Sequence, residues 1–201
     1  MKSKDIIILA GIQHVGKTTL GRLLSKKLDC RFVDTDLETE RLTGSHPRKI
    51  TADGGQKAYN AAETKTIMHI LSEFKKSSAK RIVISTGGGF CDNPKGICEL
   101  NKVGIIVCLD ADLETGFSRI LAETKKDDAG NLFGYPIYPG YEHVIPKDFD
   151  EVRKIYYAFQ SVRIARYKEL SDVIVKVNSE SPEKNLAKIE NTLIAAYSSD
   201  L

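Results

Sequence analysis

A glycine-rich segment between a short apolar run and a helical pattern narrows the possible folds more than any other part of this chain. Residues 6–10 read Ile-Ile-Ile-Leu-Ala, a run rich in β-branched residues that predicts a strand buried on both faces. From Lys17 onward, leucines recur every three or four residues, which predicts an amphipathic helix. The intervening residues, Gly11-Ile-Gln-His-Val-Gly16-Lys17-Thr18, match the pattern G-x-x-x-x-G-K-[ST] in the context that it requires. The sequence therefore predicts a phosphate-binding loop on an α/β sheet.

A loop of this kind holds phosphates mainly through its backbone. Successive N–H groups and the N-terminus of the following helix surround the β-phosphate of a nucleotide. Lys17 adds a positive charge at the β- and γ-phosphates, and the Thr18 hydroxyl coordinates Mg²⁺. Because the backbone does the binding, we expect the His14 side chain to point outward. The expected cofactors are ATP and Mg²⁺, and the expected cofactor-binding residues are Gly11, His14, Val15, Gly16, Lys17, Thr18 and Thr19.

The rest of the chain alternates between strand and helix patterns. Further strands are predicted over residues 31–33, 81–85, 103–109 and 173–177, and further helices over residues 55–76, 112–123, 149–170 and 182–198. Such alternation is typical of an α/β fold in three layers, here a five-stranded parallel sheet with helices on both faces. A length of 201 residues suits one domain, so we expect residues 1–201 to form a single domain.

The charge balance excludes some classes of partner. Thirty basic and 27 acidic residues give a net charge of only +3, which argues against nucleic acid and a membrane surface as partners. The longest apolar runs, residues 6–10 and 103–109, are far shorter than the roughly 20 residues that span a bilayer. The four cysteines match neither a zinc pattern nor a redox pair. We therefore expect a cytoplasmic protein that acts on a small molecule, as a monomer.

Two carboxylates follow the second predicted strand. Asp34 and Asp36 stand two residues apart in the segment F-V-D-T-D, a spacing that directs both toward the carboxyl edge of the sheet, where α/β proteins bind ligands. Two adjacent anions repel unless a cation or a hydroxyl lies between them, so one is a candidate Mg²⁺ ligand and the other a candidate base. The alternative is that one of them caps a helix by accepting hydrogen bonds from the N–H groups of residues 37–39.

Three consecutive glycines follow the third predicted strand. Gly87, Gly88 and Gly89 leave the backbone bare, which allows close approach of a ligand at an entropic cost on folding. A simple flexible loop is the alternative interpretation of this segment.

Together with the late segment Arg163-Ile-Ala-Arg-Tyr167, these motifs resemble the shikimate kinase family, a branch of the nucleoside-monophosphate-kinase fold. The resemblance covers nearly the whole chain apart from residues 124–147. It implies a kinase that moves the γ-phosphoryl group of MgATP to a hydroxyl group of shikimate, a precursor of the aromatic amino acids. Members of this family carry a mobile lid, which here corresponds to residues of about 120–148.

The resemblance also implies roles for individual residues. Lys17, Asp34 and Asp36 are the implied catalytic residues. Asp34 and Thr18 would hold Mg²⁺, while Asp36 would contact the acceptor hydroxyl and take its proton. The implied substrate-binding residues are Asp36, Asn60, Gly87, Gly88, Gly89 and Arg163, and the implied adenine contacts are Arg119 and Pro182.

One departure from the family concerns the acceptor. The family reads F-R-x-x-E where this chain reads Tyr59-Asn60-Ala-Ala-Glu63, so an arginine that binds the substrate carboxylate is replaced by Asn60. A charge-assisted hydrogen bond of roughly 1.5–3 kcal/mol is thereby exchanged for a neutral one. The alternative acceptor is therefore another small hydroxy acid or polyol, as in the gluconate kinases of the same fold.

The second departure concerns the lid. The family's lid arginine is missing, because no arginine occurs between Ile120 and Val152. The candidate replacements for its charge are Lys125, Lys126, Lys147 and Arg153. Aromatic residues in the lid either close over the substrate or only pin the loop to the body, namely Phe133, Tyr135, Tyr138 and Tyr141. The missing arginine also leaves open a weakly catalytic nucleotide-binding module.

Overall fold

The sheet has five parallel strands, as predicted. The computed structural model describes residues 2–141 and 143–197. The strand order is β2-β3-β1-β4-β7, and every neighbouring pair is parallel. The central strands are almost wholly buried, whereas the edge strand β7 alternates between buried and exposed residues. The strands are β1 (Ile6–Ala10), β2 (Arg31–Asp34), β3 (Ile82–Ser85), β4 (Ile105–Asp110) and β7 (Val173–Lys176).

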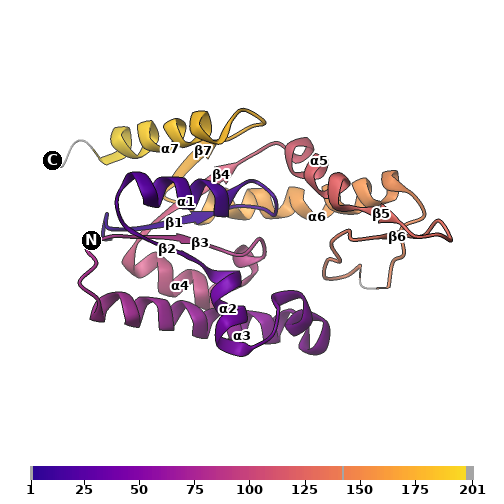
Figure 1. Ribbon diagram of the computed structural model, residues 1–201, viewed down its shortest axis with the longest axis horizontal. Coiled ribbons are helices and arrows are strands. Elements are labelled where there is room, and N and C mark those ends of the chain that lie inside the picture. The colour runs from indigo at the N-terminus through magenta and orange to yellow at the C-terminus, as the bar shows by residue number, and fades with distance from the viewer. Residues whose placement is uncertain (1, 142, 198–201) are drawn as a thin grey trace.

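Helices cover both faces of this sheet, which confirms the three-layer prediction (Figure 1). One face carries α1 (Lys17–Lys27) and α7 (Pro182–Tyr197), which contact each other. The other carries α3 (Pro47–Lys76), α4 (Pro94–Val103) and α6 (Phe149–Leu170). Two further helices, α2 (Thr35–Thr43) and α5 (Leu113–Glu123), extend from the carboxyl ends of β2 and β4. All loops that leave these carboxyl ends therefore gather at one edge of the molecule.

Three α-helical segments were not predicted. The sequence of α2 is mostly polar and shows no apolar stripe, and α4 is short and contains a proline and a glycine. The third is the first part of α3, which bends at Gly55, where φ is 70°. The predicted start at residue 55 therefore marks this bend rather than the first residue of the helix. The strand predicted over residues 103–109 begins later, because Val103 ends α4 and Gly104 follows it.

The lid begins after α5, because residues 120–123 form the last turn of that helix. Within residues 124–141 and 143–147, which the structure describes, the regular structure is a short antiparallel hairpin, formed by β5 (Lys125–Lys126) and β6 (Leu132–Phe133). Tyr138 is buried and stacks on Phe159 of α6, with the ring centroids 4.5 Å apart. This aromatic residue pins the lid to the body, whereas Phe133 is half exposed.

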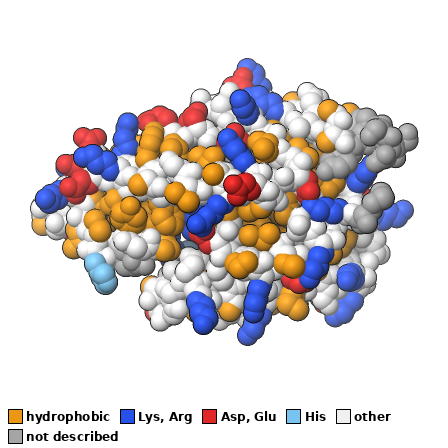
Figure 2. Space-filling model, turned by 180° about the vertical axis from the view of Figure 1, so that it is seen from behind, with side chains coloured by type: hydrophobic (Ala, Val, Ile, Leu, Met, Phe, Trp, Pro, Cys, Tyr) orange, Lys and Arg blue, Asp and Glu red, His pale blue; other side chains and the backbone are white. Residues whose placement is uncertain are grey.

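The surface fits the charge balance of the sequence. Figure 2 shows acidic and basic side chains scattered over one face, with hydrophobic side chains gathered toward the end that carries the lid. The exposed apolar residues of the lid include Ile137, Val144 and Ile145. No helix within the described ranges is both long and apolar enough to cross a membrane.

Candidate active site

The phosphate-binding loop connects β1 to α1 at the carboxyl edge of the sheet. Its glycines are required by geometry: Gly11 has a φ of 146°, and a Cβ there would lie 2.8 Å from the carbonyl oxygen of Leu109. Gly16, with a φ of 95°, precedes α1 and provides no side-chain cap. The helices α2 to α6, by contrast, each begin with a capping side chain. The N-terminus of α1 therefore keeps its N–H groups available for an anion.

Lys17 lies inside this loop rather than in solvent. Its side chain is buried, and Nζ donates hydrogen bonds to the carbonyl oxygens of Gly11 at 2.9 Å and Ile12 at 2.7 Å. Burial lowers the pKa of Lys17 to about 8, against the opposing attraction of the Asp36 and Asp34 carboxylates. Lys17 is thus positioned on the loop's own carbonyl groups, and two anions lie within electrostatic reach.

Asp34 is the helix cap that the sequence offered as an alternative, and its second carboxylate oxygen stays available for another contact. Its Oδ1 caps α2 by accepting hydrogen bonds from the N–H groups of Asp36 at 3.0 Å and Leu37 at 3.3 Å. Its Oδ2 accepts a hydrogen bond from the Thr18 hydroxyl at 2.6 Å. Capping therefore fixes the carboxylate beside the hydroxyl at the start of α1.

The pair formed by Thr18 and Asp34 fits Mg²⁺. A hydroxyl oxygen and one carboxylate are typical Mg²⁺ ligands when nucleotide phosphates and water supply the remaining oxygens. Among the residues that the structure describes, no group of three or more His, Cys, Asp or Glu side chains is arranged to hold a metal. An all-protein metal cage is therefore not formed by this part of the chain.

Asp36 follows β2, as expected, and lies in the first turn of α2. The Tyr59 hydroxyl donates a hydrogen bond to Oδ1 of Asp36 and lies 3.4 Å from Glu63. Burial raises the pKa of Asp36, and the Tyr59 hydrogen bond acts in the opposite direction. Burial likewise raises the pKa of Glu63 to about 7. The site thus holds a carboxylate with raised basicity close to Lys17.

The three glycines have different reasons to lack a side chain. A Cβ on Gly87 would lie 2.7 Å from the carboxylate of Asp36, and one on Gly88 would lie 2.2 Å from Gln13 of the phosphate-binding loop. A Cβ on Gly89 would meet only Arg163, at 3.3 Å, and a more distant glutamine. At Gly87 and Gly88 the protein's own segments leave no room for a side chain, and the approach of a ligand to the three glycines stays a prediction.

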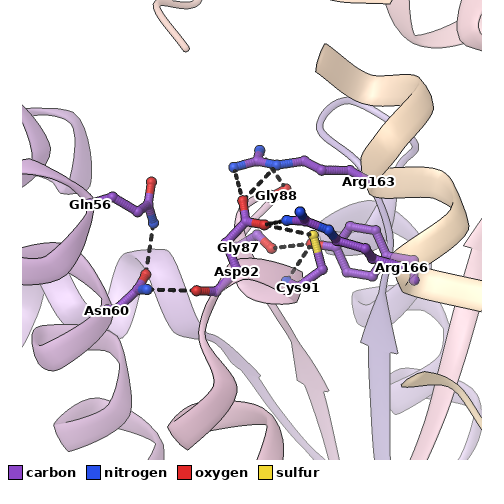
Figure 3. A network of polar contacts seen from close by, with 9 residues as sticks. Gln56, Asn60, Gly87, Gly88, Cys91, Asp92, Arg163 and Arg166 are labelled. Atoms are coloured by element: carbon purple, nitrogen blue, oxygen red, sulfur yellow. Dashed lines mark hydrogen bonds and ion pairs between the residues drawn. The ribbon is translucent and has the colours of Figure 1, made fainter. Parts of the chain in front are cut away.

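Arg163 lies in a network that joins α3, α6 and the short helix η1 (Phe90–Asp92) (Figure 3). Its Nε and Nη2 donate to the same carboxylate oxygen of Asp92, at 2.9 and 2.6 Å. Arg166 binds the other oxygen of Asp92. The Asn60 side chain donates to the backbone oxygen of Asp92 at 2.7 Å and accepts from Gln56 at 2.7 Å. Arg163 and Asn60, two of the residues expected to bind substrate, therefore both contact Asp92.

The residues expected near adenine, Arg119 and Pro182, lie on the helices that follow β4 and β7. Arg119 extends from α5 and donates to the backbone oxygen of His14. Pro182 is exposed at the start of α7, which follows β7, the neighbour of β4 in the sheet. Arg119 therefore contacts the phosphate-binding loop, while Pro182 lies near the same edge of the sheet.

The His14 side chain does not point outward as expected. It is 21% exposed, and its Nδ1 lies 3.7 Å from Glu123 at the end of α5. Burial lowers the pKa of His14, and the nearby positive charges of Lys17, Arg48 and Arg119 act in the same direction. A positive φ of 61° turns this residue against α5.

The basic residues proposed for the lid are partly engaged elsewhere. Arg153 pairs with Glu114 at 3.3 Å and lies 4.8 Å from the ring of Phe117. Lys126 lies over the ring of Phe149. Lys125 and Lys147 are exposed. None of these contacts directs a lid charge toward Lys17.

Sequence reasoning missed three side chains that organise the site: Asp92, Tyr59 and Gln56. Asp92 follows the three glycines at the same edge of the sheet, so its position was a usable signal. Tyr59 and Gln56 were not recognisable, because their contacts depend on how α3 packs against α2 and η1.

The comparisons with known proteins agree with this geometry. A family model described as shikimate kinase matches residues 14–194. A shikimate kinase of Caldicellulosiruptor bescii is 38% identical over 63% of this chain and 67% of its own length, and one of Persephonella marina is 30% identical over 79% and 87%. A structure of Acinetobacter baumannii shikimate kinase in complex with shikimate superposes with a TM-score of 0.72, at 24% identity, over 100% of this chain and 97% of that one. The chain therefore belongs to the shikimate kinase family.

Proposed function

We propose that this chain transfers the γ-phosphoryl group of ATP to a hydroxyl group of shikimate. The observation that carries the proposal is the convergence of Lys17, at the uncapped start of α1, and Asp36, a carboxylate with a raised pKa. A module that only bound nucleotide would need no such base. The curated relatives that match most of this chain carry the same activity in their names.

The loop and Lys17 would hold the phosphates. The backbone N–H groups at the start of α1 surround the β-phosphate, and Lys17 exchanges the carbonyl oxygens of Gly11 and Ile12 for phosphate oxygens. Thr18 and Asp34 would hold Mg²⁺, which when bound neutralises charge on the β- and γ-phosphates. The protein thus contributes position and electrostatic stabilisation rather than covalent chemistry.

Asp36 would act on the acceptor. As the acceptor oxygen bonds to the γ-phosphorus, the bond from that phosphorus to the β–γ bridging oxygen breaks and ADP leaves with the electron pair. The hydroxyl proton passes to the carboxylate of Asp36, whose raised pKa makes it a better base than an exposed aspartate. Tyr59 holds that carboxylate through its hydrogen bond to Oδ1.

The lid would exclude water from this reaction. Tyr138 and Phe159 anchor residues 124–147 on α6, the helix that also carries Arg163. Exclusion of water suppresses transfer of the phosphoryl group to water instead of to the acceptor. We further propose that the exposed lysines of the lid, Lys125, Lys126 and Lys147, replace the charge of the absent lid arginine when ATP and the acceptor are bound.

One chain is sufficient for this function in our proposal. Every side chain given a role belongs to the same chain, so we expect a monomer that needs no nucleic acid and no membrane. Use of ATP and four free cysteines fit the cytoplasm.

Release of ADP is the direct test. Purified protein with MgATP is assayed against shikimate, gluconate and a neutral polyol, and turnover without acceptor is subtracted. We expect saturable ADP release with shikimate, and a loss of about 10²- to 10⁴-fold in Asp36→Asn with ATP binding retained. Stimulation by another acceptor alone would refute shikimate as the substrate, and an unaffected Asp36→Asn would refute the proposed base.

A further inference from the structure

We infer that Asp92 determines acceptor specificity: it satisfies Arg163 from within the chain and thereby weakens the preference of this site for an acceptor that carries a carboxylate. The inference rests on the proposed function, because it concerns the acceptor side of that same site. It predicts recognition of the hydroxyl-bearing ring rather than of the acid group.

The first observation concerns the burial and the hydrogen-bond partners of Arg163. Its side chain is almost wholly buried on α6. Nε and Nη2, which form one edge of the guanidinium group, both bind Oδ2 of Asp92, and Nη1 donates to the carbonyl oxygen of Gly88 at 3.1 Å. The ring of Phe159 lies 4.3 Å from the guanidinium carbon and covers one face. The edge that would bind a ligand carboxylate in a two-pronged manner is therefore occupied by a carboxylate of the protein.

The second step concerns Asn60, on the opposite wall of the site. Figure 3 shows Asn60 and Gln56 reaching from α3 toward η1, while Arg163 reaches Asp92 from α6. The amide nitrogen of Asn60 binds the backbone oxygen of Asp92, and its amide oxygen binds Gln56. Both walls of the site thus use their polar groups to hold η1.

The third step is the balance of charge. Asp92 carries one negative charge against the two positive charges of Arg163 and Arg166. The side chain of Arg166 is 54% exposed, so water screens the charge that is left over. The buried arginine is neutralised by Asp92. A ligand carboxylate that reached Arg163 would either displace Asp92 or lie beside it, and two adjacent carboxylates repel each other.

The wild-type protein provides the first test. Calorimetry compares the dissociation constants of shikimate and of its methyl ester, which has the same hydroxyl groups and no charge. We expect the two constants to agree within about threefold. An unoccupied arginine would favour the acid by about tenfold or more, since a charge-assisted hydrogen bond is lost in the ester. Such a preference in the wild type would overturn the inference.

A variant provides the second test. Asp92→Asn removes the charge and keeps the shape, so we expect shikimate to bind about tenfold more tightly, with a lower KM, while the affinity for the ester is unchanged. Weaker binding of the acid would overturn the inference, because Asp92 would then only position Arg163. Asp172→Asn is the matched control, since that carboxylate pairs with Lys2 and caps the N–H group of Ile106 at the other end of the sheet.

The outcomes separate this inference from the proposed function. If the wild type transfers no phosphoryl group to shikimate, the proposed function fails, and the two binding ratios still decide the role of Asp92. Thermal unfolding and ATP affinity check that Asp92→Asn is folded. If it is not folded, the ratio of the dissociation constants of shikimate and its methyl ester in the wild type alone decides the role of Asp92. Failure of both proteins to bind either compound would overturn the inference.

Discussion

The nucleotide side and the acceptor side of this site are built in different ways. On the nucleotide side, two glycines with positive φ and an uncapped helix provide backbone groups for an anion. On the acceptor side, Arg163 and Asn60 depend on Asp92, a residue that lies far from both in the sequence. A backbone site is encoded within one short motif. A side-chain site requires several segments to meet, so its specificity changes when a single residue such as Asp92 differs.

The largest expected effect is the loss of activity on removal of the Lys17 charge from the nucleotide side. Lys17→Met removes a charge placed at the transferring phosphoryl group, so we expect kcat to fall by more than about 10³-fold because this charge stabilises the transition state. Steady-state kinetics with MgATP and shikimate measure the loss. Asp172→Asn is the control for general damage. A variant that retained a tenth of the activity would show that Lys17 serves structure only.

Substitutions at Gly88 and Gly89 distinguish a glycine that packing requires from one beside the acceptor site. Gly88→Ala would place Cβ 2.2 Å from Gln13 Cγ and 3.1 Å from its backbone, so we expect a loss of about 1–3 kcal/mol in the free energy of unfolding. Gly89→Ala would place Cβ 3.3 Å from Nη2 of Arg163, a contact that a shift of a few tenths of an ångström relieves, so we expect a smaller loss of stability, below about 1 kcal/mol, and a higher KM for the acceptor. Denaturant unfolding of both variants checks this order. Equal losses in the free energy of unfolding would contradict the difference that we assign to Gly88 and Gly89.

The pKa of Lys17 predicts how ATP binding depends on pH. In the free protein this pKa is about 8, and ATP binds the protonated form, so ATP affinity should fall as pH rises through about 8, by up to about tenfold per unit. Fluorescence titration from pH 7 to pH 9.5 measures this dependence. Lys17→Arg should abolish it, because arginine stays protonated over that range. Equal dependence in both proteins would assign it to another group.

Gln160 gives the smallest expected effect and lies where the acceptor side meets the lid. This residue of α6 is fully buried, and neither polar atom of its side chain makes a hydrogen bond of good geometry among the described residues, although the Tyr138 hydroxyl lies close enough to interact with its amide. Gln160→Leu has a similar volume and removes the cost of burying unpaired polar atoms, so we expect the free energy of unfolding to rise by about 1 kcal/mol. Thermal unfolding checks the sign. A decrease in stability would mean that the amide has a partner after all.

The sequence predicted the fold well because the pattern of buried strands and the phosphate-binding motif are local. The five strands, their parallel arrangement and the roles of Gly11 and Gly16 follow from such signals. The polar helix α2 was missed because no apolar stripe marks it, although Asp34 was recognised as a possible cap.

The acceptor side could be predicted only in part. Arg163 and Asn60 were identified through the family motif, but their common partner Asp92 was not, because η1 meets α3 and α6 only in the folded chain. Likewise, the outward orientation expected for His14 ignored the packing of α5, whose Glu123 lies close to its ring.

The most direct test of the central claim follows the phosphorus itself. In a ³¹P NMR experiment, the protein is mixed with MgATP and shikimate, and all phosphorus products are recorded with time. Our account predicts a phosphate monoester that grows in step with ADP, at a rate that falls at least about 100-fold in Asp36→Asn. Equal amounts of ADP and inorganic phosphate, with no monoester, would contradict it, because water rather than shikimate would then be the acceptor.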